Sequence, residues 1–362
     1  MRIFVAGATG YVGSRLVPRL LAAGHDVVVL TRSADRVARR PWGDLVQVVQ
    51  GDAADARTVT GGMFDVDVVV HLVHAMEAGV SDFRKAERST ARTVASAAEL
   101  AGVDHIVYLG GLVPNDIDVA DLSPHLASRV ETGRILADAG PATTEVRASL
   151  VLGAGSASFE LVRFVAQAPF PVVVHPAWAT GSCQPIGIAD LLDILAAVID
   201  DGPTDRHRII EVGGPEIGTY HDLVDVARDL LGGVPSVSAP VPTMTSPTIT
   251  GQLLATLTPI DPGTVGPLIA SLAHDSIVTG DGTDAAIAPT SVVDALAMAL
   301  AQSGEYASMP GDPDWVGATL DLGAVAQVLQ RLPGLPGRLL PGLRRDQLLS
   351  TAVDAVAALR PS

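Results

Sequence analysis

The sequence contains little cysteine and few basic residues, and both shortages exclude classes of protein. Its single cysteine, Cys183, rules out an internal disulfide framework. Its 24 lysines and arginines are outnumbered by 40 aspartates and glutamates, which gives a formal net charge of −16. Because nucleic-acid binding needs a concentrated basic surface, we expect no nucleic-acid partner. Small molecules or other proteins are the expected partners.

Uninterrupted apolar segments are also absent. Residues 164–189 and 230–260 form long uncharged stretches, but proline and polar residues break each of them repeatedly. We therefore predict no transmembrane segment and expect both stretches to be buried or to line a pocket. The first residues, MRIFVAGATG, pass from a strand pattern straight into glycines without the apolar core of a signal peptide. The expected location is cytoplasmic.

The first half of the chain alternates short β-branched runs with helical patterns. Strand patterns lie at 2–7, 26–31, 45–50, 65–73 and 105–111, and helical patterns end near Ala23 and span about 82–101. Further strand patterns follow at 144–153 and 207–214. This rhythm predicts an α/β fold of the Rossmann type, with a doubly wound parallel sheet and a smaller interleaved region.

The strongest motif is AGATGYVG at 6–13, which places three glycines between the first strand and the first helix. Glycine there permits a tight turn and lets the backbone approach a pyrophosphate held at the helix N-terminus. The motif therefore predicts a dinucleotide cofactor, with a structural turn as the alternative. The expected cofactor-binding residues are Gly7, Thr9, Gly10, Tyr11, Val12, Gly13, Arg32, Asp52, Ala53, Leu72 and Val73.

The identity of the cofactor depends on the end of the second strand. No carboxylate follows Thr31, where an acid would accept the ribose hydroxyls of NAD. Arg32, with Arg36 behind it, can instead pair with a ribose 2′-phosphate, so NADP is favoured and NAD stays open. A solvated arginine is the alternative. Asp52 is expected to accept the adenine amino group, or else to cap a turn.

These residues resemble the short-chain dehydrogenase/reductase superfamily in its extended and atypical, NmrA-like branch. The resemblance covers about residues 1–310 and rests on GATGYVG at 7–13, GD at 51–52, YLGG at 108–111, QPIGIADL at 184–191 and EVGGPEIGTY at 211–220. SPHLASRVETGRIL at 123–136 and GSASFE at 155–160 are similar to bacterial proteins described only as NAD(P)H-binding proteins or oxidoreductases. The resemblance implies the fold more strongly than the substrate.

The usual active site of this superfamily is altered in the sequence. Its members place a serine after the fifth strand and a Tyr-x-x-x-Lys pair on the next helix, which deliver a proton while nicotinamide delivers hydride. Here Gly110 and Gly111 follow the strand, and HLASR at 125–129 replaces the pair. Ser123 and Pro124 predict a helix start, so His125 and Arg129 share one helix face.

The altered pair allows two interpretations. A histidine near a helix N-terminus and an arginine should have a lowered pKa, so His125 would be a neutral hydrogen-bond donor able to polarise a carbonyl. Arg129 stays protonated and can hold ribose hydroxyls or a phosphate. His125 and Arg129 are therefore the candidate catalytic residues of an NAD(P)H-dependent oxidoreductase acting on a small apolar carbonyl, enone or quinone. Alternatively, HLASR only lines the cleft of a non-catalytic NADP(H) sensor that has a partner protein.

The expected organisation has three parts. A cofactor-binding core spans 1–152, and a substrate region spans 153–310, with sheet elements returning at about 184–214. A proline- and glycine-rich tail spans 311–362. GAGSASFE at 153–160 is expected to be a substrate loop, and Cys183 a buried small residue. No metal site is expected, because His71 and His74 have no acidic or cysteine ligand nearby in the sequence.

Overall fold

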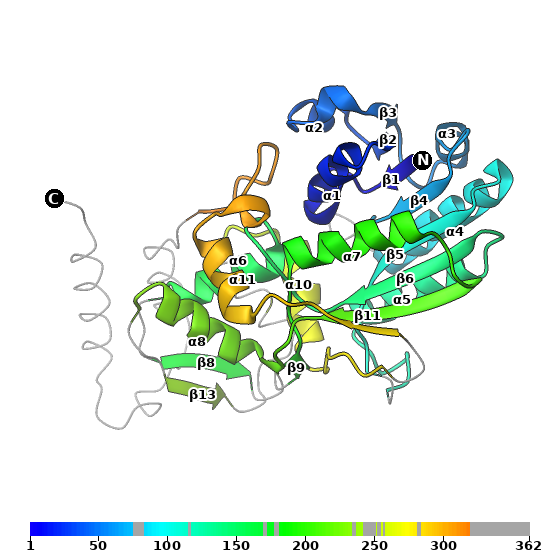
Figure 1. Cartoon of the computed structure of the whole chain (residues 1–362). Helices are drawn as coiled ribbons and strands as arrows, with labels where there is room; N and C mark the ends of the chain where they lie inside the picture. The colour runs from blue at the N-terminus through cyan, green and yellow to red at the C-terminus, as the bar shows by residue number, and fades with distance from the viewer. Residues whose placement is uncertain are drawn as a thin grey trace, which may run out of the picture.

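A large twisted sheet with helices on both faces dominates the molecule, and a smaller group of helices and short strands lies beside it (Figure 1). The computed structural model describes residues 1–74, 83–114, 117–168, 172–176, 181–233, 237–241, 251, 255, 258–280 and 284–318.

Eight strands form the main sheet in the order β14-β11-β6-β5-β4-β1-β2-β3. They are β1 (Arg2–Ala6), β2 (Asp26–Thr31), β3 (Gln47–Gln50), β4 (Val68–His71), β5 (His105–Gly111), β6 (Ala142–Ala148), β11 (His207–Gly213) and β14 (Asp284–Ile287). All their pairings are parallel, which confirms the predicted Rossmann-type sheet. The strand order reverses between β1 and β4, and ligands of such sheets bind at this reversal, outside the carboxyl ends of the strands.

Successive residues of each central strand point alternately into two hydrophobic cores, one on each face of the sheet. Ile3 and Val5 of β1 pack with one helical layer, and Phe4 and Ala6 pack with the other. The first layer contains α1 (Tyr11–Ala22) and α7 (Ile188–Asp201), and the second contains α3 (Ala56–Gly62), α4 (Phe83–Ala101) and α5 (Pro124–Ala137). Figure 1 shows the first layer in front of the sheet. A strand covered on both faces is apolar throughout, as the VVV run of β4 is.

Two helices that carry site residues begin and end as the sequence predicts. α4 matches the helical pattern expected over about 82–101. α5 begins after Ser123, whose Oγ accepts a hydrogen bond from Leu126 N at 3.2 Å, and Pro124 occupies its first turn. The cap fixes where α5 starts, so it also fixes where His125 lies.

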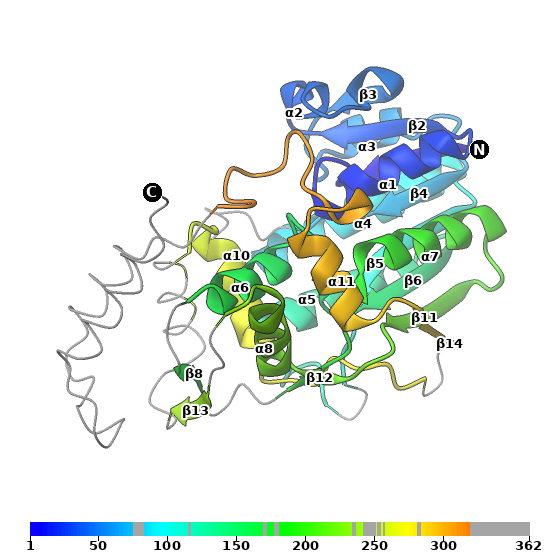
Figure 2. The same cartoon turned by 60° about the vertical axis from the view of Figure 1, so that its left-hand side comes forward.

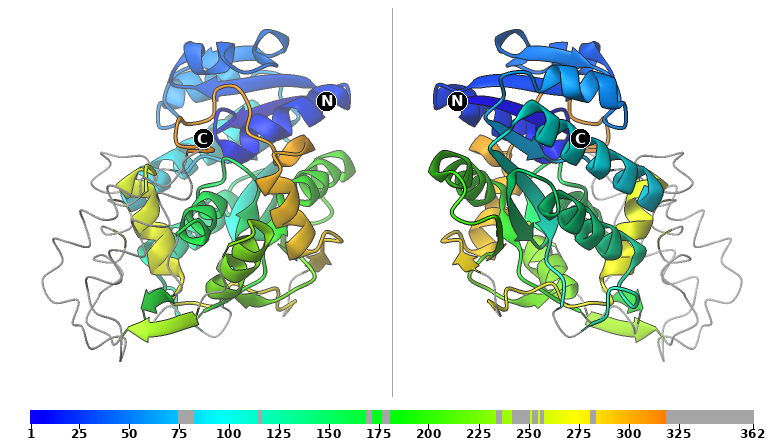
Figure 3. Two further views of the ribbon diagram at one scale, coloured as in Figure 1. Left: turned by 90° about the vertical axis from the view of Figure 1, so that its left-hand side faces the viewer. Right: turned by 90° about the vertical axis from the view of Figure 1, so that its right-hand side faces the viewer.

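The smaller group of elements is built around helices α6 (Ala157–Ala166), α8 (Tyr220–Leu230), α10 (Pro262–Ser271) and α11 (Val292–Leu300). Its short strands are β7 (Val151–Leu152), β8 (Val172–Pro176), β9 (Ser182–Cys183), β10 (Ile186–Gly187), β12 (Gly218–Thr219) and β13 (Val237–Val241). Figures 2 and 3 show this group beside the carboxyl ends of the sheet strands, with α10 next to α5 and α6. The chain leaves the group twice to add β11 and β14 to the sheet. The boundaries at 152 and 310 remain predictions.

Residues 304–318, which we call the strap, pack against the glycine motif. They include the short helix η2 (Gly304–Tyr306). Asp312 of the strap accepts hydrogen bonds from Arg15 Nη2 at 2.9 Å and Arg40 Nη1 at 2.7 Å, and Arg40 Nη2 donates to Thr9 O at 2.8 Å. The Asp312 side chain is only 5% exposed. Part of the segment expected to form a tail therefore packs into the fold, and residues 319–362 lie outside the described residues.

Removing the Asp312 carboxylate should destabilise the protein strongly. Asp312→Ala leaves the side chains of Arg15 and Arg40, each 2% exposed, without a counter-ion. Breaking a buried ion pair in this way costs about 3–5 kcal/mol. Urea denaturation of this variant is compared with Asp314→Ala, which removes an exposed carboxylate of the same strap. Equal unfolding free energies for the two variants would contradict the role given to Asp312.

Candidate functional site

The glycine motif forms a tight turn between β1 and α1, directly against the end of β4. Gly10 N donates to Gly7 O at 3.1 Å, and Gly7 has a φ of +95°. A Cβ on Gly7 would lie 2.7 Å from the carbonyl carbon of Leu72, and one on Gly13 would lie 2.4 Å from Gly7 O. Neither position admits a side chain. The first turn of α1 has no acidic residue and no side-chain cap, so its N–H groups are available to an anion. This cradle fits the diphosphate of a dinucleotide.

Tyr11 and Val12 open helix α1 and are half-buried. The guanidinium of Arg15 lies over the Tyr11 ring, 4.1 Å from its centroid. Burial raises the pKa of the Tyr11 phenol well above its usual value, against the opposing charge of Arg15. Tyr11 is therefore no substitute for the acidic tyrosine that the superfamily usually has. Its backbone N–H remains a candidate phosphate ligand, as predicted.

The other residues expected to bind the cofactor follow β2, β3 and β4. Arg32 is exposed immediately after β2, which pairs with β1 beside the glycine motif. Asp52 is exposed after β3, and its Oδ1 accepts a hydrogen bond from Ala54 N at 2.8 Å. This contact is the turn cap that was the alternative role for Asp52 in the sequence analysis. It occupies one of the two carboxylate oxygens. The other expected residues of this region are half-buried beside the same edge of the sheet: Ala53, Leu72 and Val73.

The start of α5 brings His125 and Arg129 to the carboxyl end of β5. Burial, ahead of the charges of His74 and Arg129, lowers the pKa of His125 well below its usual value. The predicted direction is confirmed, although burial outweighs the causes expected from the sequence. Arg129 is buried, donates through Nη2 to Leu109 O, and lies over the Tyr108 ring, 4.8 Å from its centroid.

A carboxylate and a second histidine, both missed by the sequence analysis, lie behind His125. His74 follows β4, and its ring stacks on the ring of His125 with centroids 4.8 Å apart and planes 13° apart. His74 Nδ1 lies 2.5 Å from Glu87 Oε1. Glu87 comes from the buried face of α4 and also accepts a hydrogen bond from Ser128. The sequence contained one sign of this role, because Glu87 is an acid on a helix face that otherwise carries alanines, a threonine and a valine.

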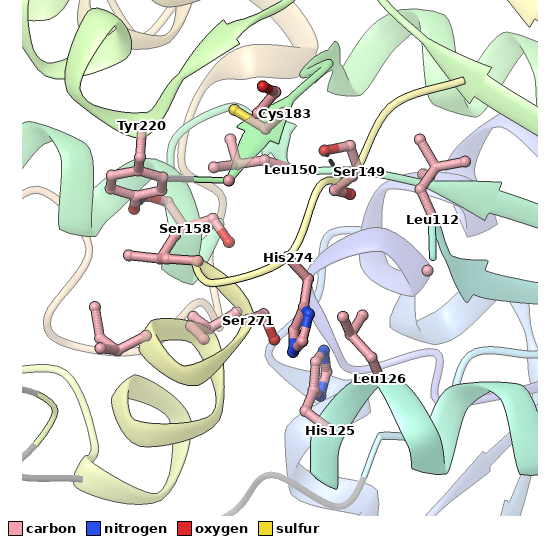
Figure 4. Close-up of a pocket in the computed structure, with 18 of the residues that line it drawn as sticks. Leu112, His125, Leu126, Ser149, Leu150, Ser158, Cys183, Tyr220, Ser271 and His274 are labelled. Carbon is pink, nitrogen blue, oxygen red and sulfur yellow. Dashed lines mark hydrogen bonds between the residues drawn. The ribbon is translucent and has the colours of Figure 1, made fainter. Parts of the chain in front are cut away.

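The carboxyl ends of β5 and β6 open into a pocket of about 740 Å³, including its mouth. Figure 4 shows His125 on one wall, with the ring of His274 facing it from the chain after α10. Ser158 of the expected substrate loop lines the pocket. Buried Cys183 lines it too, and burial raises the pKa of its thiol to about 12. The apolar lining is Leu112, Leu126, Leu150, Leu161, Leu268, Ile269 and Leu272.

The described part of the chain shows neither a metal site nor a membrane span. No group of three or more histidine, cysteine, aspartate or glutamate side chains there is arranged to hold a metal ion. No helix among the described residues is long and apolar enough to cross a membrane.

Comparison with known proteins bears on the glycine motif and the sheet around it. Residues 7–151 match a family of NAD(P)H-binding domains. They form an NAD(P)H-binding domain. Within this domain and the helix that follows β5, Gly110 and Gly111 stand where the superfamily that the sequence resembles has its serine, and His125 and Arg129 stand where it has tyrosine and lysine.

Two curated relatives cover about two thirds of the chain. A ketoreductase of Stigmatella aurantiaca that acts on 4-hydroxy-2-methyl-3-oxo-4-farnesyl-3,4-dihydroquinoline-1-oxide is 30% identical over 237 residues, 64% of each chain. Subunit 9 of the mitochondrial NADH dehydrogenase [ubiquinone] 1 alpha subcomplex of Arabidopsis thaliana is 26% identical over 234 residues. The chain spans 57% of the length of that plant protein.

Solved structures share the fold at low sequence identity. A nucleoside-diphosphate-sugar epimerase of Staphylococcus aureus superposes with a TM-score of 0.62 at 18% identity, over 82% of this chain and 100% of the epimerase. An NADPH-dependent quinone oxidoreductase of Escherichia coli gives a TM-score of 0.58 at 19% identity, over 81% and 98% of the two chains. The Rossmann-type sheet is therefore shared with enzymes of different activity.

The buried histidine of β4 should make stability depend on pH. Burial, followed by the charge of Arg129, lowers the pKa of His71 to about 3. Between pH 6.5 and that value the unfolded chain binds the extra proton, so acidification favours unfolding. We expect the unfolding free energy to fall from pH 7 to pH 5, and His71→Gln to reduce the slope by ~1.4 kcal/mol per pH unit. His207→Gln, which removes a histidine at the exposed start of β11, is the matched control. An equal change of slope in both variants would contradict the role given to the buried His71.

Proposed function

We propose that this protein binds NADP(H) and reduces a small, neutral and largely apolar carbonyl, enone or quinone. The observation that supports this most directly is a pair of buried nitrogen atoms, His125 Nδ1 and Arg129 Nη1. Neither has a hydrogen-bond partner within the described ranges. Buried polar groups are normally satisfied, so these two orphan nitrogens, one of them on the pocket-lining His125, indicate where ligand oxygens bind.

The two nitrogens suit different partners. When bound, the nicotinamide supplies the hydride for the substrate carbon. Because its pKa is lowered, His125 is neutral at pH 7 and donates a hydrogen bond to the substrate oxygen as negative charge develops there. The proton that completes the reduction comes from water. Arg129 cannot transfer a proton, and its contacts with Leu109 and Tyr108 hold it as a fixed cation for a cofactor ribose hydroxyl.

The chemistry of the pocket supports a neutral substrate. Among its described lining residues there is no lysine, arginine, aspartate or glutamate. A nucleotide sugar carries a diphosphate, which proteins usually bind with cationic side chains, so this lining favours the ketoreductase and quinone reductase relatives over the epimerases. A quinone or enone also needs no strong protein acid, because it is itself a good electron acceptor.

A non-catalytic NADP(H) sensor is the second candidate. HLASR replaces the tyrosine and lysine that the superfamily uses for proton transfer, and this replacement favours a protein that binds the cofactor without consuming it. Such a sensor would present a cofactor-dependent surface to a partner protein. In either role we place the protein in the cytoplasm, where a single unpaired cysteine is usual.

Arg32 should determine the preference for NADPH. We expect NADPH to bind at least several-fold more tightly than NADH, because Arg32 can pair with the 2′-phosphate and no acid directly follows the last residue of β2. Arg32→Ala should remove most of the difference, since a hydrogen bond to a charged group contributes about 1.5–3 kcal/mol. Titration calorimetry measures both affinities, with Arg134→Ala, an exposed arginine in the last turn of α5, as the control. Equal affinities of the wild type for both cofactors would refute the assignment.

His125 and Arg129 should respond differently to truncation. His125→Ala should lower kcat by about 10²–10⁴ and leave NADPH affinity nearly unchanged, because its hydrogen bond forms mainly in the transition state. Arg129→Ala should mainly weaken NADPH binding, because a fixed cation positions the cofactor. Steady-state kinetics and NADPH titration measure the two effects, with His207→Ala as the control. A His125→Ala variant at the wild-type rate would show that His125 only lines the cleft.

A further inference from the structure

Glu87 is a buried carboxylate that does not reach the pocket. Its side chain is 3% exposed, and Glu87 is not among the residues that line the cavity. It extends from α4, where the neighbouring buried residues are apolar or small: Thr90, Ala91, Val94, Ala95, Ala97 and Ala98. Burying a carboxylate costs several kcal/mol unless it is paired and hydrogen-bonded. A packing role would therefore be filled better by an apolar side chain.

The contacts of Glu87 connect three elements. Oε1 lies 2.5 Å from Nδ1 of His74, which follows β4, and Oε2 accepts a hydrogen bond from Ser128 of α5. Burial alone raises the pKa of Glu87, but the contacts with His74 and Ser128 and the charge of Arg129 overcome this and lower the pKa to about 2. Glu87 is thus ionised at neutral pH and can only accept hydrogen bonds. The facing nitrogen of His74 must therefore carry a proton.

His74 connects Glu87 to the pocket wall, because its ring stacks on the ring of the pocket-lining His125. The angle between the two ring planes is 13°, and the ring centroids lie 4.8 Å apart. A carboxylate that binds one nitrogen of a histidine fixes both the tautomer and the ring orientation. The ring of His125 then packs against a His74 ring whose orientation is fixed. Among the described residues, the other ionisable groups around the stack are His71 of β4, Tyr108 of β5, Arg129 of α5 and, across the pocket, His274.

We propose that Glu87 is a positioning residue: it holds His74 in the Nδ1-protonated form and, through the stacked rings, keeps His125 in the orientation that serves the pocket. The kinetic part of this inference rests on the proposed reductase function. The structural part, which concerns the tautomer of His74 and the environment of His125, does not.

The structural part is tested by NMR on the full-length protein labelled with ¹⁵N-histidine. His74→Gln and His125→Gln variants assign the two rings. In the wild type, His74 should show a protonated Nδ1 and an unprotonated Nε2. Glu87→Gln, which keeps the shape but removes the charge, should abolish this tautomer preference and shift the His125 ring resonances. Glu131→Gln, which removes a partly exposed carboxylate paired with Arg88, is the matched control and should change neither ring.

The opposite tautomer of His74 in the wild type would overturn the proposal without any variant having to fold. Unchanged His125 resonances in a folded Glu87→Gln protein would overturn it as well. Both NMR measurements can be made even if no substrate turns over. Failure of this proposal can therefore be told apart from failure of the proposed reductase function.

A kinetic measurement distinguishes positioning from a purely structural role. With a substrate that turns over, Glu87→Gln should lower kcat by about 10- to 100-fold, the usual cost of removing a group that orients an active-site side chain. KM and NADPH affinity should stay within about twofold of the wild type, because Glu87 contacts neither ligand. An equal loss in Glu131→Gln, or an unchanged kcat in Glu87→Gln, would contradict the positioning role.

Discussion

Close backbone contact between the glycine turn and the end of β4 determines the geometry of the whole site. Gly7 approaches Leu72 so closely that a Cβ would lie 2.7 Å from its carbonyl carbon. This contact aligns the N-terminus of α1 with the segment that continues through Val73 to His74. The pairing of β4 with β5 then extends the alignment to the residues before the pocket. The phosphate cradle and the histidine stack are therefore positioned by one rigid edge of the sheet.

The polar groups at this edge form an arrangement unlike a tyrosine and lysine pair. Glu87 is ionised, Arg129 is a fixed cation, and burial lowers the pKa values of His71, His74 and His125. Neutral imidazoles between two opposite charges can orient and stabilise an oxygen atom, but they are poor proton donors. Under the proposed function, this arrangement favours substrates that accept hydride readily, because no tyrosine is present to supply the proton.

The sequence predicted those parts of the molecule that depend on local patterns. Strand runs such as VVV in β4, the glycine motif and the Ser123–Pro124 helix start each act within a few residues, and each appears in the structure as expected. The contacts that join distant segments were not predicted. Glu87 and Ser128 are 41 residues apart, and Arg15 and Asp312 are 297 apart. No local pattern records such pairings, since they follow from how α4, α5 and the strap pack. The pocket wall contributed by His274 was missed for the same reason.

Under the proposed function, an NADP(H)-binding fold without the usual tyrosine reduces neutral substrates. This proposal is tested most directly by following NADPH oxidation by the purified protein against quinones, enones and aldehydes, with a separate assay for epimerisation of UDP-glucose in the presence of NAD⁺ as the nucleotide-sugar control. We expect turnover of at least one of the three neutral substrate classes and no turnover of UDP-glucose, because the described pocket lining contains no lysine, arginine, aspartate or glutamate. Tight NADPH binding without oxidation by any neutral class, or turnover of UDP-glucose, would contradict it.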